Sequence, residues 1–335
     1  MANRLKIGVV GVGHLGRAHV RILSELDSCE LVGCHDTDSE KSEKAAEEFN
    51  TQAFSSAQEL TAECDAVSLV VPTSEHHKCA IEALNSGKHL FVEKPIASTS
   101  DQAAEIVRLA DSSGLKLMVG HIERFNPALK SLKDRITYPS FIEAHRLAPF
   151  NPRGLDVAVI FDLMIHDIDL SLHLTGSQVT DIQASASAVV SDKMDIANAR
   201  LTFASGCTAN LTASRISPNA MRKLRIFQPN GYISFDLGKP SAEIYQLVDE
   251  DDATQSGSGS FSMAFGDTGK KIVYDKPQIK GYDMLTAELA SFIESIETGE
   301  PVPVTGEEAS EALRVASEIE NIAQAGIDNL RAHLK

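Results

Sequence analysis

Three glycines near the start of the chain constrain its fold more than any other feature. Gly11, Gly13 and Gly16 form a G-x-G-x-x-G pattern directly after the apolar run "LKIGVV" (5 to 10). Between a strand and a helix, the first glycine permits a tight turn and the second lets a pyrophosphate approach the backbone. The third allows the helix to pack closely on the strand. The pattern therefore predicts a phosphate-binding turn at a helix N-terminus.

An acidic residue at the end of the next expected strand extends this prediction. The run "ELVGCHD" (30 to 36) ends at Asp36, 23 residues after Gly13. A carboxylate at this place accepts hydrogen bonds from the adenosine ribose hydroxyls and repels a 2'-phosphate, which favours NAD over NADP. The alternative is an ordinary glycine-rich turn followed by a solvated aspartate.

Short apolar runs alternate with amphipathic stretches over the first 121 residues. Further strands are expected at "AVSLVVP" (66 to 72), "KHLFVEKP" (88 to 95) and "LKLMVGH" (115 to 121). Continuous apolar strands separated by helices predict an α/β fold with a doubly wound parallel sheet, the Rossmann arrangement. We therefore expect an NAD-binding domain over residues 1–121.

The pattern changes after residue 121. Strand-rich segments joined by turns such as "ASG" and "PNG" predict a C-terminal α+β domain with an open, largely antiparallel sheet. We expect residues 122–335 to bind substrate and to mediate oligomerisation, with the last helices packing back toward the first domain. One sheet face would not be fully covered by helices, which favours a homodimer or homotetramer. The acidic, Ser- and Gly-rich segment 249–260 predicts a mobile surface loop.

Composition excludes several classes of protein. The net charge is -16, and no block of lysine and arginine offsets it, which disfavours a nucleic-acid partner. No apolar run approaches a membrane span, and the first apolar segment is too short for a signal peptide. Five scattered cysteines without a CxxC pair indicate reduced thiols and a cytoplasmic location, with no structural zinc site. These cysteines are Cys29, Cys34, Cys64, Cys79 and Cys207.

A lysine follows the fourth of these runs. Glu93, Lys94 and Pro95 lie at the carboxyl end of a strand, the edge where open α/β sheets bind ligands. In a partly desolvated cleft beside a cationic nicotinamide ring, the ammonium form of Lys94 is disfavoured. The lysine can then exchange a proton with a substrate hydroxyl or donate a hydrogen bond to it. Taken alone, the pattern fits a surface lysine about equally well.

The stretch "IFDLMIHDIDLSLHL" (160 to 174) places four ionisable residues in an apolar run. Asp162, His166, Asp169 and His173 share one stripe of a helix, which fits a metal site, a catalytic pair or the polar edge of a helix. The stripe spreads three ligands over roughly 10 Å, too far for one metal ion. Apolar neighbours on the other sides indicate a mostly buried helix, whose polar groups need partners. A carboxylate at Asp162 can orient the imidazole of His166 four residues on, giving an acid/base pair, while Asp169 and His173 keep a structural role.

These motifs together resemble the glucose-fructose oxidoreductase and inositol dehydrogenase family (Gfo/Idh/MocA). The matching segments are "GVVGVGHLGRAH", "VVPTSEHHKCAIEALNSGKHLFVEKPIA", "FDLMIHDIDL" and "ELASFIESIETGEPVPVTGEEASEALRVA", and the resemblance spans almost the whole chain. Two more segments, "MVGHIERFNPA" and "RLAPFNPRGLDVAVIFDLMIHDIDL", look like the branch of bacterial UDP-N-acetylglucosamine 3-dehydrogenases. That branch oxidises the sugar 3-hydroxyl so that a partner aminotransferase can install an amine. Sister branches act on other UDP-sugars, inositols and free sugars.

The resemblance implies NAD-dependent oxidation of a sugar hydroxyl, in a pathway for lipid A or surface polysaccharide sugars. It makes Lys94, Asp162 and His166 the catalytic group. We expect His166 to be the base and Lys94 to hold the hydroxyl, with Lys94 as the alternative proton acceptor, and we expect no metal. On the substrate side it places His121, Arg124 and Asn126. Arginines considered for the diphosphate of a UDP-sugar are Arg124, Arg146, Arg153 and Arg215. Cofactor-side positions are Gly11, Gly13, Gly16, Asp36, Pro72, Thr73, His76 and Glu93.

Two alternatives to this function stay open. Within enzymes, the substrate is an inositol, a free sugar or another UDP-sugar. The alternative from another class of protein is a dinucleotide-binding sensor, which keeps the fold and catalyses no reaction. Retention of Lys94, Asp162 and His166 together argues against the sensor.

Overall fold

The computed structural model describes residues 4–151, 157–251, 261–264, 266 and 268–333. Arg153 and most of the predicted surface loop, residues 252–260, lie outside these ranges. By its contacts the chain divides into two compact units, one formed by Met1–Phe125 and Asp283–Arg314, the other by Asn126–Tyr282 and Val315–Lys335. Within the described ranges, no helix is both long and apolar enough to cross a membrane.

The first unit contains a sheet in which six described strands all run parallel, in the order β3-β2-β1-β4-β5-β6. The strand order reverses between β1 and β4, the point at which open α/β sheets bind ligands. This confirms the predicted Rossmann sheet. The structure adds the strand β3, which was not predicted because a strand of two residues leaves no recognisable apolar run. The strands are β1 Leu5–Val10, β2 Cys29–His35, β3 Gln52–Ala53, β4 Ala66–Leu69, β5 His89–Glu93 and β6 Leu117–Gly120.

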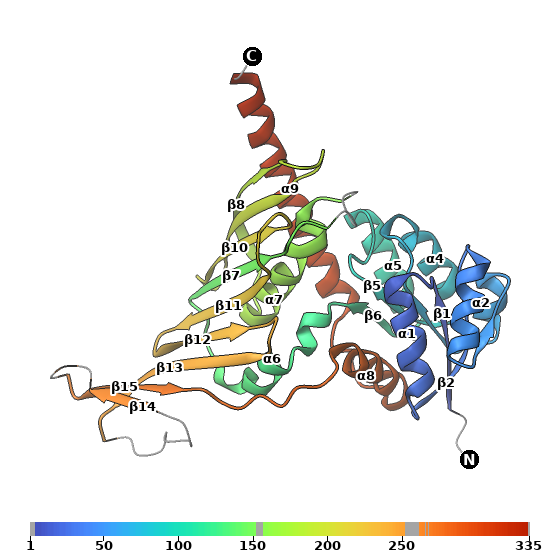
Figure 1. The fold of residues 1–335 in the computed structure, drawn as a ribbon, viewed down its shortest axis with the longest axis horizontal. Helices are drawn as coiled ribbons and strands as arrows, with labels where there is room; N and C mark the ends of the chain where they lie inside the picture. Colours follow the sequence, from blue (N-terminus) through green and yellow to red (C-terminus); the bar gives the residue numbers. More distant parts are fainter. Residues whose placement is uncertain (1–3, 152–156, 252–260, 265, 267, 334–335) are drawn as a thin grey trace. The chain divides into compact units, whose positions relative to one another are not determined.

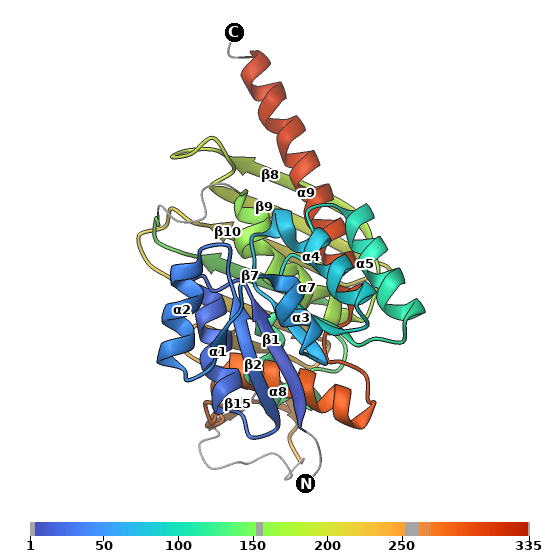
Figure 2. The same ribbon diagram turned by 90° about the vertical axis from the view of Figure 1, so that its right-hand side faces the viewer.

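Helices cover both faces of this sheet. Figure 2 shows α1 and α2 on one side and α3, α4 and α5 on the other. Helix α8 comes from far along the chain and packs against α1, and its Phe292 meets Phe91 of β5 edge to face at 5.8 Å between ring centroids. The helices are α1 His14–Glu25, α2 Ser39–Glu48, α3 Ala57–Ala62, α4 Thr73–Asn85, α5 Ser100–Ser112 and α8 Met284–Thr298.

The second unit contains a sheet of nine described strands in the order β14-β15-β13-β12-β11-β7-β10-β9-β8 (Figure 1). Neighbouring strands are antiparallel except β7 and β10, which run parallel. The prediction of an open, largely antiparallel sheet is thereby confirmed. The strands are β7 Phe141–Leu147, β8 Val179–Ser187, β9 Ile196–Phe203, β10 Thr208–Ser214, β11 Met221–Gln228, β12 Gly231–Asp236, β13 Ser241–Asp249, β14 Phe261–Ala264 and β15 Lys270–Asp275.

The two faces of this second sheet differ. Side chains alternate along β7 and β10 between buried and part-exposed, as expected for a sheet with one covered face. Figure 1 shows α6 (Pro127–Leu132) and α7 (Ile165–Thr175) on one side of it. The other face carries a row of aromatic rings across five neighbouring strands, with adjacent centroids 4.6 to 5.6 Å apart. The row consists of Phe141, Phe227, Tyr232, Tyr245 and Tyr274.

Candidate functional site

The glycine-rich turn joins β1 to α1. Gly11 has a φ of 92°, and a side chain there would collide with the backbone of Val70. A side chain at Gly16 would collide with the carbonyl group of Gly11. At Gly13, by contrast, an added Cβ meets no described atom within 4 Å. The outer glycines are therefore required by the fold, whereas the space at Gly13 is open to a ligand.

The N-terminus of α1 fits a bound phosphate group. The helix begins at His14, and its N-cap, Gly13, provides no side-chain hydrogen bond. The first turn has no acidic residue, so no local negative charge opposes the helix dipole and its terminal amides. Because these amides need an acceptor, the residues present fit the pyrophosphate of a dinucleotide.

Asp36 lies beside this turn, just after β2. Its Oδ2 atom accepts a hydrogen bond from the amide of Val12 at 2.7 Å, and its Oδ1 atom accepts one from the amide of Asp38 at 2.9 Å. These bonds fix the half-buried carboxylate next to the glycine-rich turn. This position fits a carboxylate that accepts from the ribose of NAD, a contact that stays a prediction.

His76 connects the loops that follow β4 and β5. Its Nδ1 atom lies 2.8 Å from the carbonyl oxygen of Pro95, and its Nε2 atom lies 2.9 Å from that of Val71. The side chain is buried, and burial lowers the pKa of His76 in spite of the opposing effects of both carbonyl groups and Glu93. Its described contacts are to loop backbone, so contact with the cofactor stays a prediction.

Glu93 is buried at the end of β5. Its Oε2 atom accepts a hydrogen bond from the amide of Lys94 at 3.3 Å, and its Oε1 atom lies 3.2 Å from Nε2 of His19. The other ring nitrogen of His19 lies 2.9 Å from the hydroxyl of Ser68 on β4. His19 is not among the predicted site residues, although its place three residues after Gly16 puts it on the same buried helix face.

Lys94, Pro72 and Thr73 lie along one edge of the first sheet. Lys94 follows β5 directly and is half-buried, while Pro72 is the N-cap of α4, which Thr73 begins. Strands β4 and β5 are neighbours, so both loops emerge from the same carboxyl edge. The structure therefore brings the predicted lysine to the ligand-binding edge of the sheet.

The stretch with Asp162 and His166 begins as a π-helix, Ile160–Met164, and continues as α7. The amide of Ile165 donates to the carbonyl group of Ile160, one residue further back than in an α-helix. The residue spacing predicts one regular helix over the whole stretch, because a π-turn leaves no clear periodicity in sequence. This wide turn interrupts the regular helical spacing around Asp162, and such turns are frequent at functional sites.

Burial separates the ionisable residues of this stretch. Asp162 and His166 are both half-buried, whereas Asp167 and Asp169 are 3% and 1% exposed. His173 is exposed near the end of α7. The two partly accessible groups are the ones predicted to be catalytic, which suits proton exchange with a ligand. Among the described residues, no three His, Cys, Asp or Glu side chains are grouped so as to hold a metal ion.

Three arginines considered for a diphosphate are paired with carboxylates. Arg124 donates to Glu308 at 2.9 Å, Arg146 donates twice to Asp167 at 2.8 and 2.9 Å, and Arg215 donates to Asp195 at 2.9 Å. All three are less than a tenth exposed. A guanidinium neutralised in this way attracts a diphosphate less strongly than one without such a partner.

The other two predicted substrate residues are also buried. His121 is 1% exposed, and Asn126 is fully buried. The side chain of Asn126 accepts from the amide of Ala128 and donates to the carbonyl group of Leu237, both at 3.1 Å, and so caps α6. Direct contact of His121, Arg124 or Asn126 with substrate stays a prediction.

Comparison with known families matches both halves of the chain. Residues 5–121 match the oxidoreductase family with an NAD-binding Rossmann fold, and residues 139–234 match the Gfo/Idh/MocA C-terminal domain.

Individual relatives match over nearly the full length. A UDP-N-acetylglucosamine 3-dehydrogenase of Acidithiobacillus ferrooxidans is 36% identical over 322 residues, which cover 96% of this chain and 98% of the relative. Its solved structure is similar with a TM-score of 0.87, at 35% identity and the same coverage. A myo-inositol 2-dehydrogenase of Thermotoga maritima is 24% identical over 328 residues, covering 92% and 93%. The chain therefore belongs to the Gfo/Idh/MocA family of oxidoreductases, with an NAD-binding Rossmann fold in its N-terminal half.

Proposed function

We propose that this protein oxidises the 3-hydroxyl of UDP-N-acetylglucosamine to the 3-keto sugar, with NAD as the oxidant. The observation that carries the proposal is the similarity to the Acidithiobacillus enzyme along almost all of both chains. The open space at Gly13, the uncapped N-terminus of α1 and the position of Asp36 support NAD as the cofactor.

In this proposal, each ionisable group has a distinct role. His166 accepts the proton of the sugar hydroxyl, Asp162 orients the imidazole and stabilises its protonated form, and Lys94 donates a hydrogen bond to the same oxygen. NAD, when bound, supplies the group that accepts the hydride from the sugar carbon. The products are the ketone, NADH and one proton, which leaves through His166. The partial exposure of Asp162, His166 and Lys94 supports these roles.

A screen of sugar substrates with NAD tests the proposal. UDP-N-acetylglucosamine, other UDP-sugars, inositols and free sugars are each incubated with the protein, and the absorbance of reduced nicotinamide is followed. A carbonyl trap removes the ketone, because oxidation of a secondary alcohol by NAD is unfavourable at equilibrium. We expect the highest kcat/KM with UDP-N-acetylglucosamine. No turnover with any UDP-sugar contradicts the proposed substrate.

Oxidation of an inositol is the second candidate. The observation in its favour is the match to the Thermotoga myo-inositol 2-dehydrogenase across 92% of this chain. The pairing of Arg124 with Glu308 also weakens one candidate contact for a diphosphate. Turnover of inositols alone in the same screen selects this second candidate. Binding of NAD without turnover of any compound selects the non-catalytic sensor.

We also propose a cytoplasmic location and an aminotransferase that acts on the ketone. All five cysteines are free thiols in the structure, which fits a reducing compartment. A 3-keto sugar is a substrate for transamination, so a pyridoxal phosphate enzyme that accepts UDP-linked ketones is the expected consumer. Coupled turnover with such an enzyme, measured as amine formation, tests this step.

The aromatic row supports self-association as a homodimer or homotetramer. Part-exposed rings of Phe227, Tyr232 and Tyr245 lie stacked on the sheet face opposite the helices. An apolar row of this length favours burial against another surface. Light scattering after size-exclusion chromatography should give a multiple of the monomer mass. The variant Tyr245→Lys should give a lower measured mass than the wild type. A monomeric wild-type protein contradicts the proposal.

A further inference from the structure

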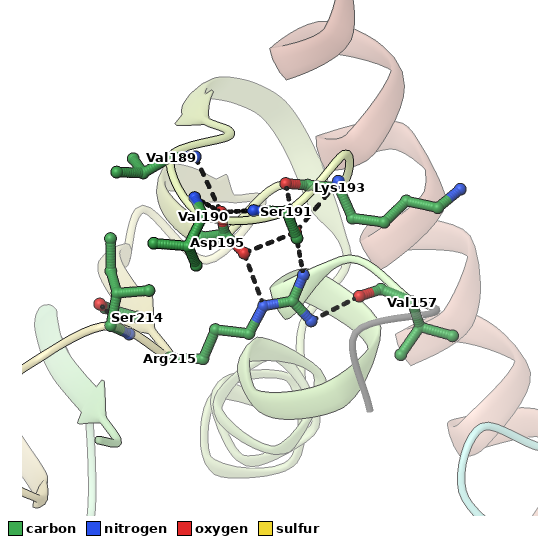
Figure 3. A network of polar contacts seen from close by, with 9 residues as sticks. Val157, Val189, Val190, Ser191, Lys193, Asp195, Ser214 and Arg215 are labelled. Carbon is green, nitrogen blue, oxygen red and sulfur yellow. Dashed lines mark hydrogen bonds and ion pairs between the residues drawn. The ribbon is translucent and has the colours of Figure 1, made fainter. Parts of the chain in front are cut away.

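A buried arginine holds the chain just before the helix with Asp162 and His166. Arg215 follows β10 directly, and Figure 3 shows its guanidinium between Val157 and the loop that carries Ser191 and Asp195. It donates to the carbonyl oxygen of Val157 at 2.7 Å and, on the loop 189–195, to Oδ1 of Asp195 at 2.9 Å and to the hydroxyl of Ser191 at 3.1 Å. Arg215 is 5% exposed, so these bonds are largely shielded from water.

The segment held by Arg215 is the one from which the helix starts. Next to Val157, the amide of Val159 donates to the carbonyl group of Met194 at 2.9 Å. The amide of Asp162 in turn donates to the carbonyl group of Ala158 at 3.2 Å. The position of Asp162 thus depends on residues 157–159, whose backbone is fixed by contacts with the Asp195 loop and Arg215.

Asp195 makes this anchor rigid. It is fully buried, and its Oδ2 atom accepts from the amides of Val189 and Val190 at 2.7 Å and of Ser191 at 3.1 Å. Burial acts to raise the pKa of Asp195, but these bonds and those from the Ser191 hydroxyl and Arg215 hold it well below its usual range. The carboxylate therefore stays charged and keeps Arg215 in place at every pH suited to the assay.

A second buried arginine holds the other end of the same stretch. Arg146 on β7 binds both carboxylate oxygens of Asp167, the residue after His166. Strands β7 and β10 are neighbours, so the two arginines extend from adjacent central strands. The π-helix and the first turn of α7 thus lie between two anchors on the sheet.

We propose that Arg215 is a positioning residue, which sets where the π-helix begins and hence how Asp162 lies relative to His166. This inference rests on the proposed function, in which these two residues act as a pair. A planar guanidinium can donate to several acceptors at once, whereas the single nitrogen of a lysine cannot hold Asp195 and Val157 in the same geometry.

A double-mutant cycle between Arg215→Lys and Asp162→Asn tests the inference. With saturating NAD and sugar, Arg215→Lys should lower kcat by about tenfold or more, because small misplacements of catalytic groups are costly. The KM for NAD should change less than about twofold, since the glycine-rich turn belongs to the first unit. In the Asp162→Asn background, Arg215→Lys should lower kcat only slightly further, because the group that Arg215 positions is already altered.

Control variants make each outcome decisive. Arg200→Lys alters an exposed arginine on β9 of the same sheet, which contacts Asn210, and should keep wild-type kcat. If Arg215→Lys does not fold, Asp195→Asn enters the same cycle, because it weakens the anchor without a change of size. A kcat within twofold of wild type, or equal losses in both backgrounds, overturns the positioning role. Full activity of Asp162→Asn alone instead overturns the proposed catalytic pair.

Discussion

The Nδ1 atom of His76 lies 2.8 Å from the carbonyl oxygen of Pro95, while its Nε2 atom lies 2.9 Å from that of Val71. One buried ring thus connects two loops at the carboxyl edge of the first sheet, and one of these loops carries Lys94. Carbonyl groups only accept hydrogen bonds, so a neutral ring with a single N–H can donate to one of them at a time. The buried ring nevertheless lies between the two carbonyl groups, so its volume sets the separation of the two loops.

Replacing His76 should disturb both loops. His76→Ala removes the one hydrogen bond that the neutral ring donates to these carbonyl groups, at a cost of about 1 to 3 kcal/mol. We expect a lower melting temperature and a fall of about tenfold or more in kcat/KM for NAD, both measurable on purified protein. The control is His77→Ala on the same helix, whose Nε2 contacts Glu105 at the surface. Equal behaviour of the two variants would contradict this role.

The glycines of the turn should respond differently to the same substitution. In Gly16→Ala the new methyl group collides with the Gly11 carbonyl, so we expect loss of soluble, folded protein. In Gly13→Ala the methyl group meets no described atom within 4 Å, so the protein should fold with a normal melting temperature. Titration with NAD should then show affinity reduced about tenfold or more, because the methyl group takes space needed by the pyrophosphate. Wild-type affinity of Gly13→Ala would argue against this binding site.

Asp36 should determine the choice between NAD and NADP. Asp36→Asn keeps an oxygen that can accept from Val12 but removes the charge that repels a 2'-phosphate. We expect the ratio of kcat/KM for NAD to that for NADP to fall about tenfold or more, since each 1.4 kcal/mol is a factor of ten. Asp38→Asn, two residues on and exposed, should leave the ratio unchanged. An unaltered ratio in Asp36→Asn would exclude the ribose contact.

The proposed catalytic residues should affect turnover more than cofactor binding. His166→Ala and Lys94→Ala should each lower kcat about a hundredfold or more, the usual contribution of a positioned acid or base. The NAD affinity, measured by fluorescence titration, should stay within about threefold of wild type, a difference below 1 kcal/mol. His173→Ala, at an exposed position of the same helix, should behave as wild type. Undiminished turnover in either variant removes that residue from the mechanism.

Local patterns predicted the fold and the NAD cofactor, because their determinants lie close together in sequence. The glycines and Asp36 span a single strand-helix-strand unit, so spacing alone fixes their relation. His19 and Glu93 are 74 residues apart and meet only because β5 lies near α1 in the folded unit. Burial likewise could not be read from spacing at Asn126, whose side chain caps α6 and reaches Leu237. The π-turn at Asp162 also escaped prediction, because a helical period cannot show one wider turn.

His89 should make the stability of the protein depend on pH. Its Nδ1 atom accepts a hydrogen bond from the amide of Lys116 at 2.9 Å, which requires that nitrogen to be unprotonated. Burial and, to a lesser extent, the charge of Lys116 lower the pKa of His89 below its ordinary value of 6.5. The unfolded chain therefore takes up a proton near pH 6.5 while the native state resists it. Stability is fully present above this pH and is lost as the pH falls from there toward the native pKa.

Melting temperatures at about pH 7.5 and about pH 5.5 should reveal this linkage, with the lower value at the lower pH. His89→Asn offers an oxygen to the Lys116 amide but cannot titrate, so the difference between the two melting temperatures should shrink. It should not vanish, because the pKa of His76 is also lowered by burial and acts with the same sign. His173→Asn, at an exposed position, should leave the difference as in wild type. An unchanged or larger difference in His89→Asn would contradict the assignment to His89. The substitution removes only this titrating group, so the pH dependence would then arise from another residue.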